Sequence, residues 1–191
     1  GASVDSILFF RYGVAVLLLG SFLLFTKQSL RVSAKQAGVL LVLGVLFSLS
    51  SIGLFEAYNY IASGLATTLI FLYPVFVAII MVFLRVVPSW PVWLSIVATF
   101  VGVFLMTQDE SGQAVNPIGV VLSIGSALTY ALFIVIVNRS KTIHSISNSL
   151  LTFYALLTGA VIFFGKMMWA HTGILTGIES CWAWGNLIAL A

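Results

Sequence analysis

Charged residues are scarce in this chain of 191 residues. Asp, Glu, Lys and Arg together make up 7% of it, whereas a soluble domain carries about 25%. So few charges cannot cover a water-facing surface, and the mean hydropathy of +1.19 points the same way. The composition excludes a soluble globule and a disordered chain. The net charge of +3 is too small for a nucleic-acid binder and acts instead on orientation in a membrane.

Cysteine occurs once, as Cys181, which excludes an internal disulfide and a cysteine-based metal cluster. The sequence contains neither a G-x-x-x-x-G-K-[ST] phosphate loop nor an H-E-x-x-H zinc motif. No set of Ser, His and Asp falls at one depth of the apolar runs. We therefore expect no catalytic residue, no metal and no cofactor, and the chain is predicted not to be an enzyme.

Long apolar runs make up most of the chain. A helix needs about 20 apolar residues to cross the hydrocarbon core, and the polar interruptions leave seven such runs. They are too long and too continuous for the alternating strands of a membrane barrel. The predicted fold class is all-α, a polytopic bundle of transmembrane helices. The predicted spans are residues 7–25, 38–58, 65–84, 91–107, 117–137 and 146–164, and a seventh that begins near Trp182.

The two ends of the chain carry an expectation of their own. Residue 1 is glycine, and the last apolar run reaches Ala191 before it is long enough to cross a bilayer. From these features we expect an internal fragment of a longer membrane protein, with material missing at both ends.

Basic residues are unevenly distributed among the loops. Three loops that the span order puts on one side of the membrane contain six of the eight Lys and Arg residues. The positive-inside rule assigns these loops to the cytoplasm and residue 1 to the outer side. The predicted location is the cytoplasmic (inner) membrane, with the lipid bilayer as a partner and the oligomeric state left open. The six residues are Lys27, Arg31, Lys35, Arg85, Arg139 and Lys141.

Polar groups at membrane depth are few, so each is a candidate for function. Arg11 lies near the outer end of the first span and Glu56 near the outer end of the second. The structural interpretation is an ion pair, or two charges that reach the headgroup level. The functional interpretation is that Glu56 binds a proton or a cationic group.

Pro74 lies inside the third predicted span, where it has no N–H and its ring opposes the carbonyl of Ile70. A carbonyl freed in lipid needs a partner, so this bend is expected to face protein or a cavity. Helical spacing predicts that Thr67, Phe71, Pro74 and Ala78 share one face. The kink serves packing alone or lines a transport cavity, since transporter sites often use broken helices near the midplane.

Tyrosines complete the set of polar candidates. Tyr130 lies at mid-depth of the fifth span, where its hydroxyl needs a partner, either within the protein or on a substrate. Tyr60 lies at the outer interface, as a gate or as part of an aromatic belt. The residues predicted to line a substrate pathway are Glu56, Tyr60, Thr67, Phe71, Tyr73, Pro74 and Tyr130.

Small residues recur at four-residue spacing in the fifth span. Gly119, Ser123 and Ala127 share one helical face there. Such a face lets helices approach closely in lipid. Packing inside the bundle explains it, and a dimerisation motif is the alternative.

The run EAYNYIASGLATTLIFLYPVFVAIIMVFL contains a span-ending Tyr-Ile-Ala-Ser and then Tyr73-Pro74. It resembles the third and fourth spans of EamA-type carriers in the drug/metabolite transporter superfamily. Arg11 in FFRYGVA is similar to an arginine early in the family's second span. The segment NPIGVVLSIGSALTYALFIVIVNR resembles the start of the second EamA repeat. The family's usual Glu after the fourth span is absent from FLRVVPSWP.

The resemblance implies ten spans in two inverted five-span repeats, as in many secondary transporters. Residues 1–108 would then hold most of the first repeat (family spans two to five), 109–116 a periplasmic linker, and 117–191 the start of the second repeat (family spans six to eight). The implied function is a secondary transporter that moves a small metabolite or drug, in the direction of export. The alternatives are a non-transporting membrane subunit or scaffold and an intramembrane enzyme.

Overall fold

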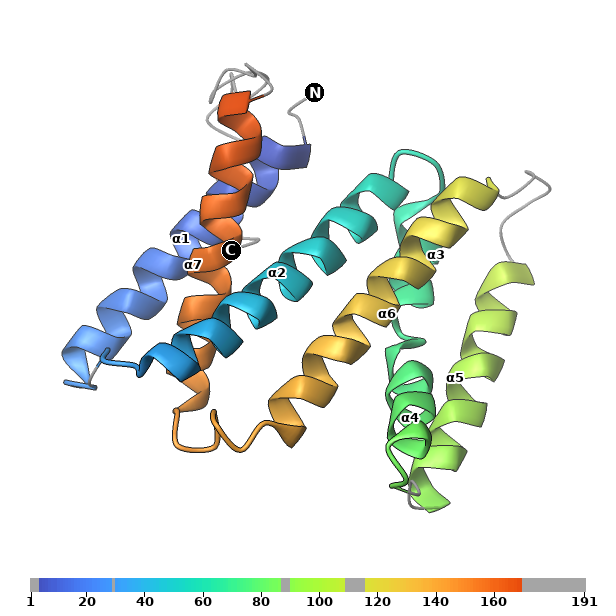
Figure 1. The fold of residues 1–191 in the computed structure, drawn as a ribbon. Helices are drawn as coiled ribbons and strands as arrows, with labels where there is room; N and C mark the ends of the chain where they lie inside the picture. The colour runs from blue at the N-terminus through green and yellow to red at the C-terminus, as the bar shows by residue number, and fades with distance from the viewer. Residues whose placement is uncertain (1–3, 29, 87–89, 109–115, 170–191) are drawn as a thin grey trace. The chain divides into compact units, whose positions relative to one another are not determined.

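The computed structural model describes residues 4–28, 30–86, 90–108 and 116–169. All regular secondary structure in those ranges is α-helical, so the predicted all-α class is confirmed. A helix satisfies its own backbone hydrogen bonds, which a chain in lipid requires. The helices drawn in Figure 1 are α1 (Val4–Phe25), α2 (Ala34–Ala57), α3 (Ser63–Ile70), α4 (Tyr73–Phe83), α5 (Trp90–Gln108), α6 (Pro117–Arg139) and α7 (Asn148–Trp169).

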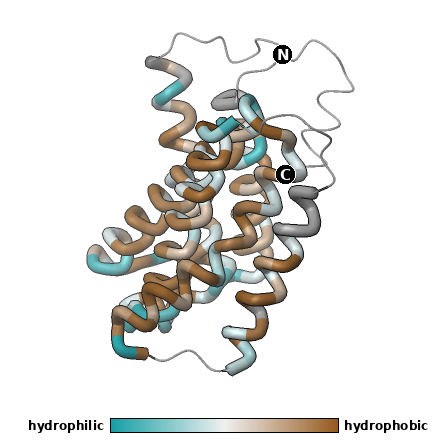
Figure 2. The backbone as a smooth tube through the Cα atoms, turned by 90° about the vertical axis from the view of Figure 1, so that its right-hand side faces the viewer, coloured by the Kyte–Doolittle hydropathy of each residue, from teal (hydrophilic) through white to brown (hydrophobic). Residues whose placement is uncertain are grey.

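Most of these helices are long and apolar enough to cross a membrane. Figure 2 shows hydrophobic residues along the helices and hydrophilic ones mainly near their ends. The fourth predicted span falls on α5, whose apolar stretch is shorter (Trp90–Gly102). The seventh, near Trp182, lies outside the described residues, so the seven-span count and the inverted repeats stay predictions. The segments that can span are Leu8–Phe25, Ala34–Ala57, Ser63–Phe83, Pro117–Arg139 and Asn148–Lys166.

The chain forms two compact units. The terminal unit comprises Gly1–Ser48 and Ser140–Ala191 and contains α1, the first part of α2, and α7. The central unit is Leu49–Arg139 and contains the end of α2 together with α3 to α6. The predicted linker falls mostly on residues 109–115, outside the described residues, and the repeat boundaries remain a prediction.

Close packing at glycines organises the terminal unit, in which α1 lies along α7 (Figure 1). A side chain at Gly159 of α7 would overlap the ring of Tyr12 and the hydroxyl of Ser48. A side chain at Gly44 of α2 would likewise overlap Thr158. The Tyr12 ring also meets Phe163 edge-on, with ring centroids 5.2 Å apart. In lipid there is no hydrophobic driving force between helices, so their association depends on close packing. The small residues at these positions let α1, α2 and α7 approach closely.

Helix α6 organises the packing of the central unit, because both α3 and α4 pack against it. Its small-residue face, Gly119, Ser123 and Ala127, is buried. A side chain at Gly119 would overlap Ile61 in the turn between α2 and α3. The face therefore serves packing within this chain, the first of the two interpretations drawn from its spacing. The hydrophobic cluster beside it consists of Ala57, Ile61, Leu65, Ala66 and Leu69.

The third predicted span, residues 65–84, is two helices and not one. Helix α3 ends at Ile70 and α4 begins at Tyr73, with Phe71 and Leu72 in a turn between them. The amides of Phe71 and Leu72 each reach back three residues, both over 3.1 Å. Pro74 explains the break, since it cannot donate to the carbonyl four residues earlier. At about 1.5 Å per residue, the 8 and 11 residues of α3 and α4 cross the bilayer core only together.

The break also corrects the predicted face of Thr67, Phe71, Pro74 and Ala78. Helical spacing does not continue through the turn at Phe71 and Leu72. Phe71 is accordingly 56% exposed, whereas Ala78 is only 3% exposed. The four residues do not form one continuous surface.

Candidate functional site

Two tyrosines meet beside the break in the third span. Tyr73 is the first residue of α4, and its ring contacts that of Tyr130 on α6. The ring centroids are 5.0 Å apart and the planes are inclined by 85°, an edge-to-face arrangement that aromatic rings favour. Tyr130 also lies parallel to Phe133, with centroids 5.9 Å apart. The structure thus brings together two of the predicted pathway residues that are far apart in the sequence.

This aromatic contact lies near the middle of both membrane-crossing segments. Tyr73 is equally far from the two ends of Ser63–Phe83, and Tyr130 lies near the middle of Pro117–Arg139. Pro74, the cause of the break, follows Tyr73 directly. Helix α3 therefore presents its C-terminal carbonyl end, and α4 its N-terminal end, at mid-depth. These ends have partial negative and partial positive charge, respectively.

Ser123 adds a polar group without a hydrogen-bond partner to the side of α6 that carries Tyr130. Its side chain is 0% exposed, and within the described residues its Oγ has no hydrogen-bond partner. Ser123 lies two turns before Tyr130, so both point to one side of α6. A buried hydroxyl without a partner costs about 1–3 kcal/mol, and such a group calls for an explanation such as a ligand or a water.

A reciprocal serine pair joins α2 to α6 close by. Ser50 Oγ donates to the carbonyl of Ser126 over 3.0 Å, and Ser126 Oγ donates to the carbonyl of Ser50 over 2.6 Å. Both side chains are buried. Each such bond between helices in a membrane stabilises by about 0.6 kcal/mol. This pair was not predicted from the sequence, although three serines in the apolar run FSLSS were a signal for it.

The other predicted pathway residues lie at the end of the central unit where α2 passes into α3. Glu56 accepts a hydrogen bond from Asn59 Nδ2 over 3.1 Å. Thr67 Oγ1 donates to the carbonyl of Ser63 over 2.6 Å and lies 3.3 Å from the hydroxyl of Tyr58. These bonds give Glu56 and Thr67 structural partners without excluding a further role.

Tyr60 and Phe71 are the exposed members of the predicted set. Tyr60 is 44% exposed, although its Cβ packs against Gly119. Phe71, in the turn of the break, is 56% exposed. The predicted pathway therefore divides into an end group, Glu56, Tyr60 and Thr67, and a mid-depth group, Phe71, Tyr73, Pro74 and Tyr130.

The predicted ion pair between Arg11 and Glu56 would join the two units. Arg11 belongs to α1 of the terminal unit, and Glu56 to α2 within the central unit. Both residues are partly buried. The pair stays a prediction, to be tested by mutation.

Comparisons with known proteins add a family and one relative. The profile of the EamA-like transporter family matches residues 1–108. An uncharacterized transporter of Synechocystis sp., sll1319, is 32% identical over 123 residues, covering 62% of this chain and 37% of that protein. The chain thus spans well under half the length of this relative. No solved structure matches the chain.

Proposed function

This chain belongs to the EamA-like transporter family, and from that membership we propose that it works in a secondary transporter that exports a small metabolite or drug across the cytoplasmic membrane. The relative in Synechocystis is itself named a transporter, which supports the class. The helices long enough to cross a bilayer agree with it.

The observation that carries the proposed pathway is the break between α3 and α4 beside Tyr130. A solute that crosses a membrane needs polar partners at mid-depth, where lipid offers none. The break supplies two helix ends, and secondary transporters use such ends to hold solutes near the midplane. Tyr73 and Tyr130 supply rings and hydroxyls at the same depth.

Ser123 extends this surface along α6. Its hydroxyl has no hydrogen-bond partner among the described residues, so it can donate to a solute or accept from one and make the missing hydrogen bond. Pockets for small molecules combine apolar and aromatic walls with a few placed polar groups. Tyr73 and Tyr130 at mid-depth, with the buried Ser123 two turns away on the same side of α6, would give a pathway this composition.

The test is uptake of a metabolite panel into proteoliposomes that contain the full-length protein. The informative variants are Tyr130→Leu and Ser123→Ala, with Tyr12→Phe as the matched control, since Tyr12 packs in the terminal unit. We expect Tyr130→Leu to lower the transport rate at least about tenfold, equivalent to about 1.4 kcal/mol, and Tyr12→Phe to keep it. Wild-type rates in well-folded Tyr130→Leu would overturn the pathway, and no transport of any compound by the wild type would count against the function.

A further inference from the structure

Two loops of the terminal unit form one basic edge, defined here as residues 26–28 and 30–36 between α1 and α2 and residues 140–147 between α6 and α7. We propose that this basic edge binds the phosphate headgroup of an anionic phospholipid. The groups that bind it are Lys27, Arg31, Lys35 and Lys141.

Hydrogen bonds hold the two loops together. Gln36 Nε2 donates to the carbonyl of Thr142 over 3.3 Å and to Ser145 Oγ over 3.1 Å. Ser147 Oγ donates to Gln28 Oε1 over 2.9 Å. The lysines of the first loop therefore lie on the same edge as Lys141 of the second, although the loops are far apart in the sequence.

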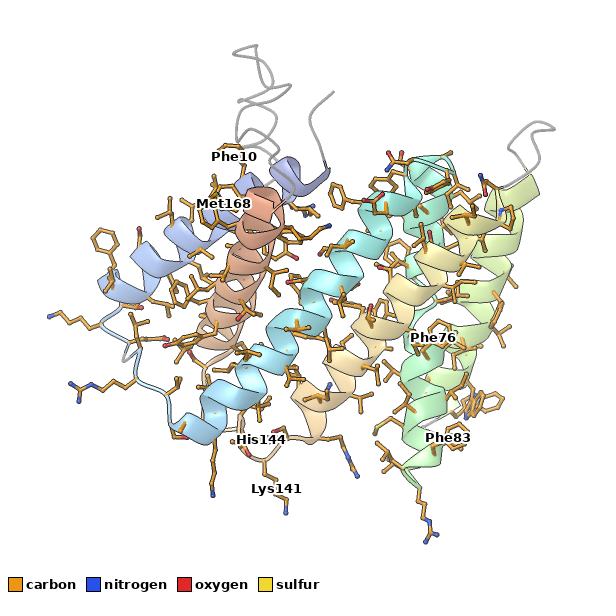
Figure 3. All side chains as sticks on the ribbon, turned by 45° about the horizontal axis from the view of Figure 1, so that its top comes forward. Phe10, Phe76, Phe83, Lys141, His144 and Met168 are labelled. Atoms are coloured by element: carbon orange, nitrogen blue, oxygen red, sulfur yellow. The ribbon has the colours of Figure 1, made fainter. Side chains whose placement is uncertain are left out.

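The charge of the basic edge is of one sign. The side chains of its four Lys and Arg residues are all exposed, and neither loop contains an Asp or a Glu. Helices α2 and α7 both begin here, at Ala34 and Asn148, and helix N-termini add partial positive charge. Figure 3 shows Lys141 extending from its loop away from the helices. Such clusters beside membrane helices attract anionic lipid headgroups.

The backbone at Lys27 fixes where the first loop leaves α1. Its φ is 51°, in the left-handed region that glycine normally occupies after a helix. The turn is closed by bonds from the Lys27 amide to the carbonyl of Leu24 and from the Gln28 amide to the carbonyl of Leu23, both over 3.1 Å. The turn therefore holds Lys27 directly after the last turn of α1.

Apolar side chains beside Lys27 favour a lipid over a soluble phosphate. Phe22, Leu24 and Phe25 in the last turn of α1 are exposed, Phe25 by 86%. A phospholipid bound by its phosphate at Lys27 would lay its acyl chains along this surface. Bilayer lipid covers these side chains in either case because α1 is a candidate membrane span, and a lipid is favoured because Lys27 follows them at the level of the headgroups.

The test measures lipid binding to the full-length, delipidated protein in a neutral detergent by native mass spectrometry. The probes are phosphatidylglycerol, phosphatidylcholine and sn-glycerol 3-phosphate. The site variant combines Lys27→Gln and Lys141→Gln. The control variant removes two cations away from the basic edge, by Arg85→Gln and Lys166→Gln. Arg85 is a close match because it has the same backbone conformation as Lys27, with φ of 60° at the end of α4.

We expect the site variant to lose affinity for phosphatidylglycerol by roughly fivefold per lysine at low salt, and the control variant to keep most of it. Phosphatidylcholine should bind weakly to all three proteins. Equal losses in both variants would mean diffuse attraction by net charge and would overturn the site. If glycerol 3-phosphate binds as tightly as phosphatidylglycerol, the proposal that the occupant is a lipid is wrong.

A second pair of variants covers the case in which the double site variant does not fold. Lys27→Gln alone is then compared with Arg85→Gln alone, with Lys27→Arg as the conservative variant. A loss confined to Lys27→Gln and restored in Lys27→Arg supports the proposal. No loss in Lys27→Gln contradicts it. Neither result depends on transport activity.

Discussion

The rings of Tyr73 and Tyr130 meet edge-on at 5.0 Å between centroids. The contact lies beside the two-residue break that separates α3 from α4. Tyr73 is held there by Pro74, which forces a new helix to start, and Tyr130 by the packing of α6 on both half-helices. Predictions about the mid-depth group can therefore be tested at Pro74 as well as at the two tyrosine rings.

Replacing Pro74 by alanine should join α3 and α4 into a straighter helix. Alanine restores the missing N–H and removes the ring clash, which costs about 3 kcal/mol in a helix interior. We expect a melting temperature equal to or above that of the wild type, together with a transport rate at least about tenfold lower. Thermal unfolding and proteoliposome uptake measure the two effects.

Pro117→Ala is the control for this change, because Pro117 begins α6, where proline is well tolerated. It should alter neither quantity. Unchanged transport in Pro74→Ala would show that the break serves packing alone.

Replacing Gly159 by alanine should destabilise the terminal unit. The new methyl group would overlap Tyr12 and Ser48, and overpacking typically costs about 1–3 kcal/mol, more than the roughly 1 kcal/mol that alanine gains over glycine in a helix. The expected result is a lower melting temperature. Gly13→Ala, which meets nothing within 4 Å, should leave it unchanged or raise it. A Gly159→Ala protein as stable as wild type would mean that the Tyr12 ring and the Ser48 hydroxyl move aside without cost.

Arg11 and Glu56 are predicted to form a structural ion pair. Glu56→Gln and Arg11→Leu should each lower the melting temperature, and the double variant should recover part of the loss, since one buried charge without its partner is worse than none. A double-mutant cycle without coupling would show that Arg11 and Glu56 do not form a pair. If Glu56 instead carries a proton or contacts the substrate, Glu56→Gln will fold normally and lose transport or its pH dependence.

The orientation predicted from the basic loops can be tested by cysteine labelling. In a Cys181→Ala background, Ser145→Cys should resist an impermeant thiol reagent in intact cells, because the loop of residues 140–147 is assigned to the cytoplasm. Ser111→Cys, assigned to the outer side, should react. Labelling of Ser145→Cys from outside would reverse the topology.

Much of the helical organisation was predictable because it depends on local properties. An apolar run of about 20 residues has one stable form in lipid, the helix, so five of the predicted spans coincide with segments able to cross a membrane. A bend at Pro74 was predictable for the same reason, since the missing N–H belongs to that residue whatever surrounds it, although the division into two helices was not predicted. The resemblance carried by Tyr73-Pro74 and the neighbouring residues agrees with the family match over residues 1–108.

Contacts between helices were decided by the tertiary structure. In the sequence Ser50 and Ser126 are two serines among many, and only the packing of α2 on α6 makes them a reciprocal pair. The predicted face through Phe71 failed because two residues with hydrogen bonds to the third residue before them shift the helical register of everything that follows. The sequence predicted neither that Ser123 Oγ lacks a hydrogen-bond partner among the described residues nor that Gln36 donates to the carbonyl of Thr142, and the reason is the same. Hydropathy and helical period specify which residues form a helix, but in lipid the rotation and neighbours of each helix follow from close packing and hydrogen bonds between distant segments.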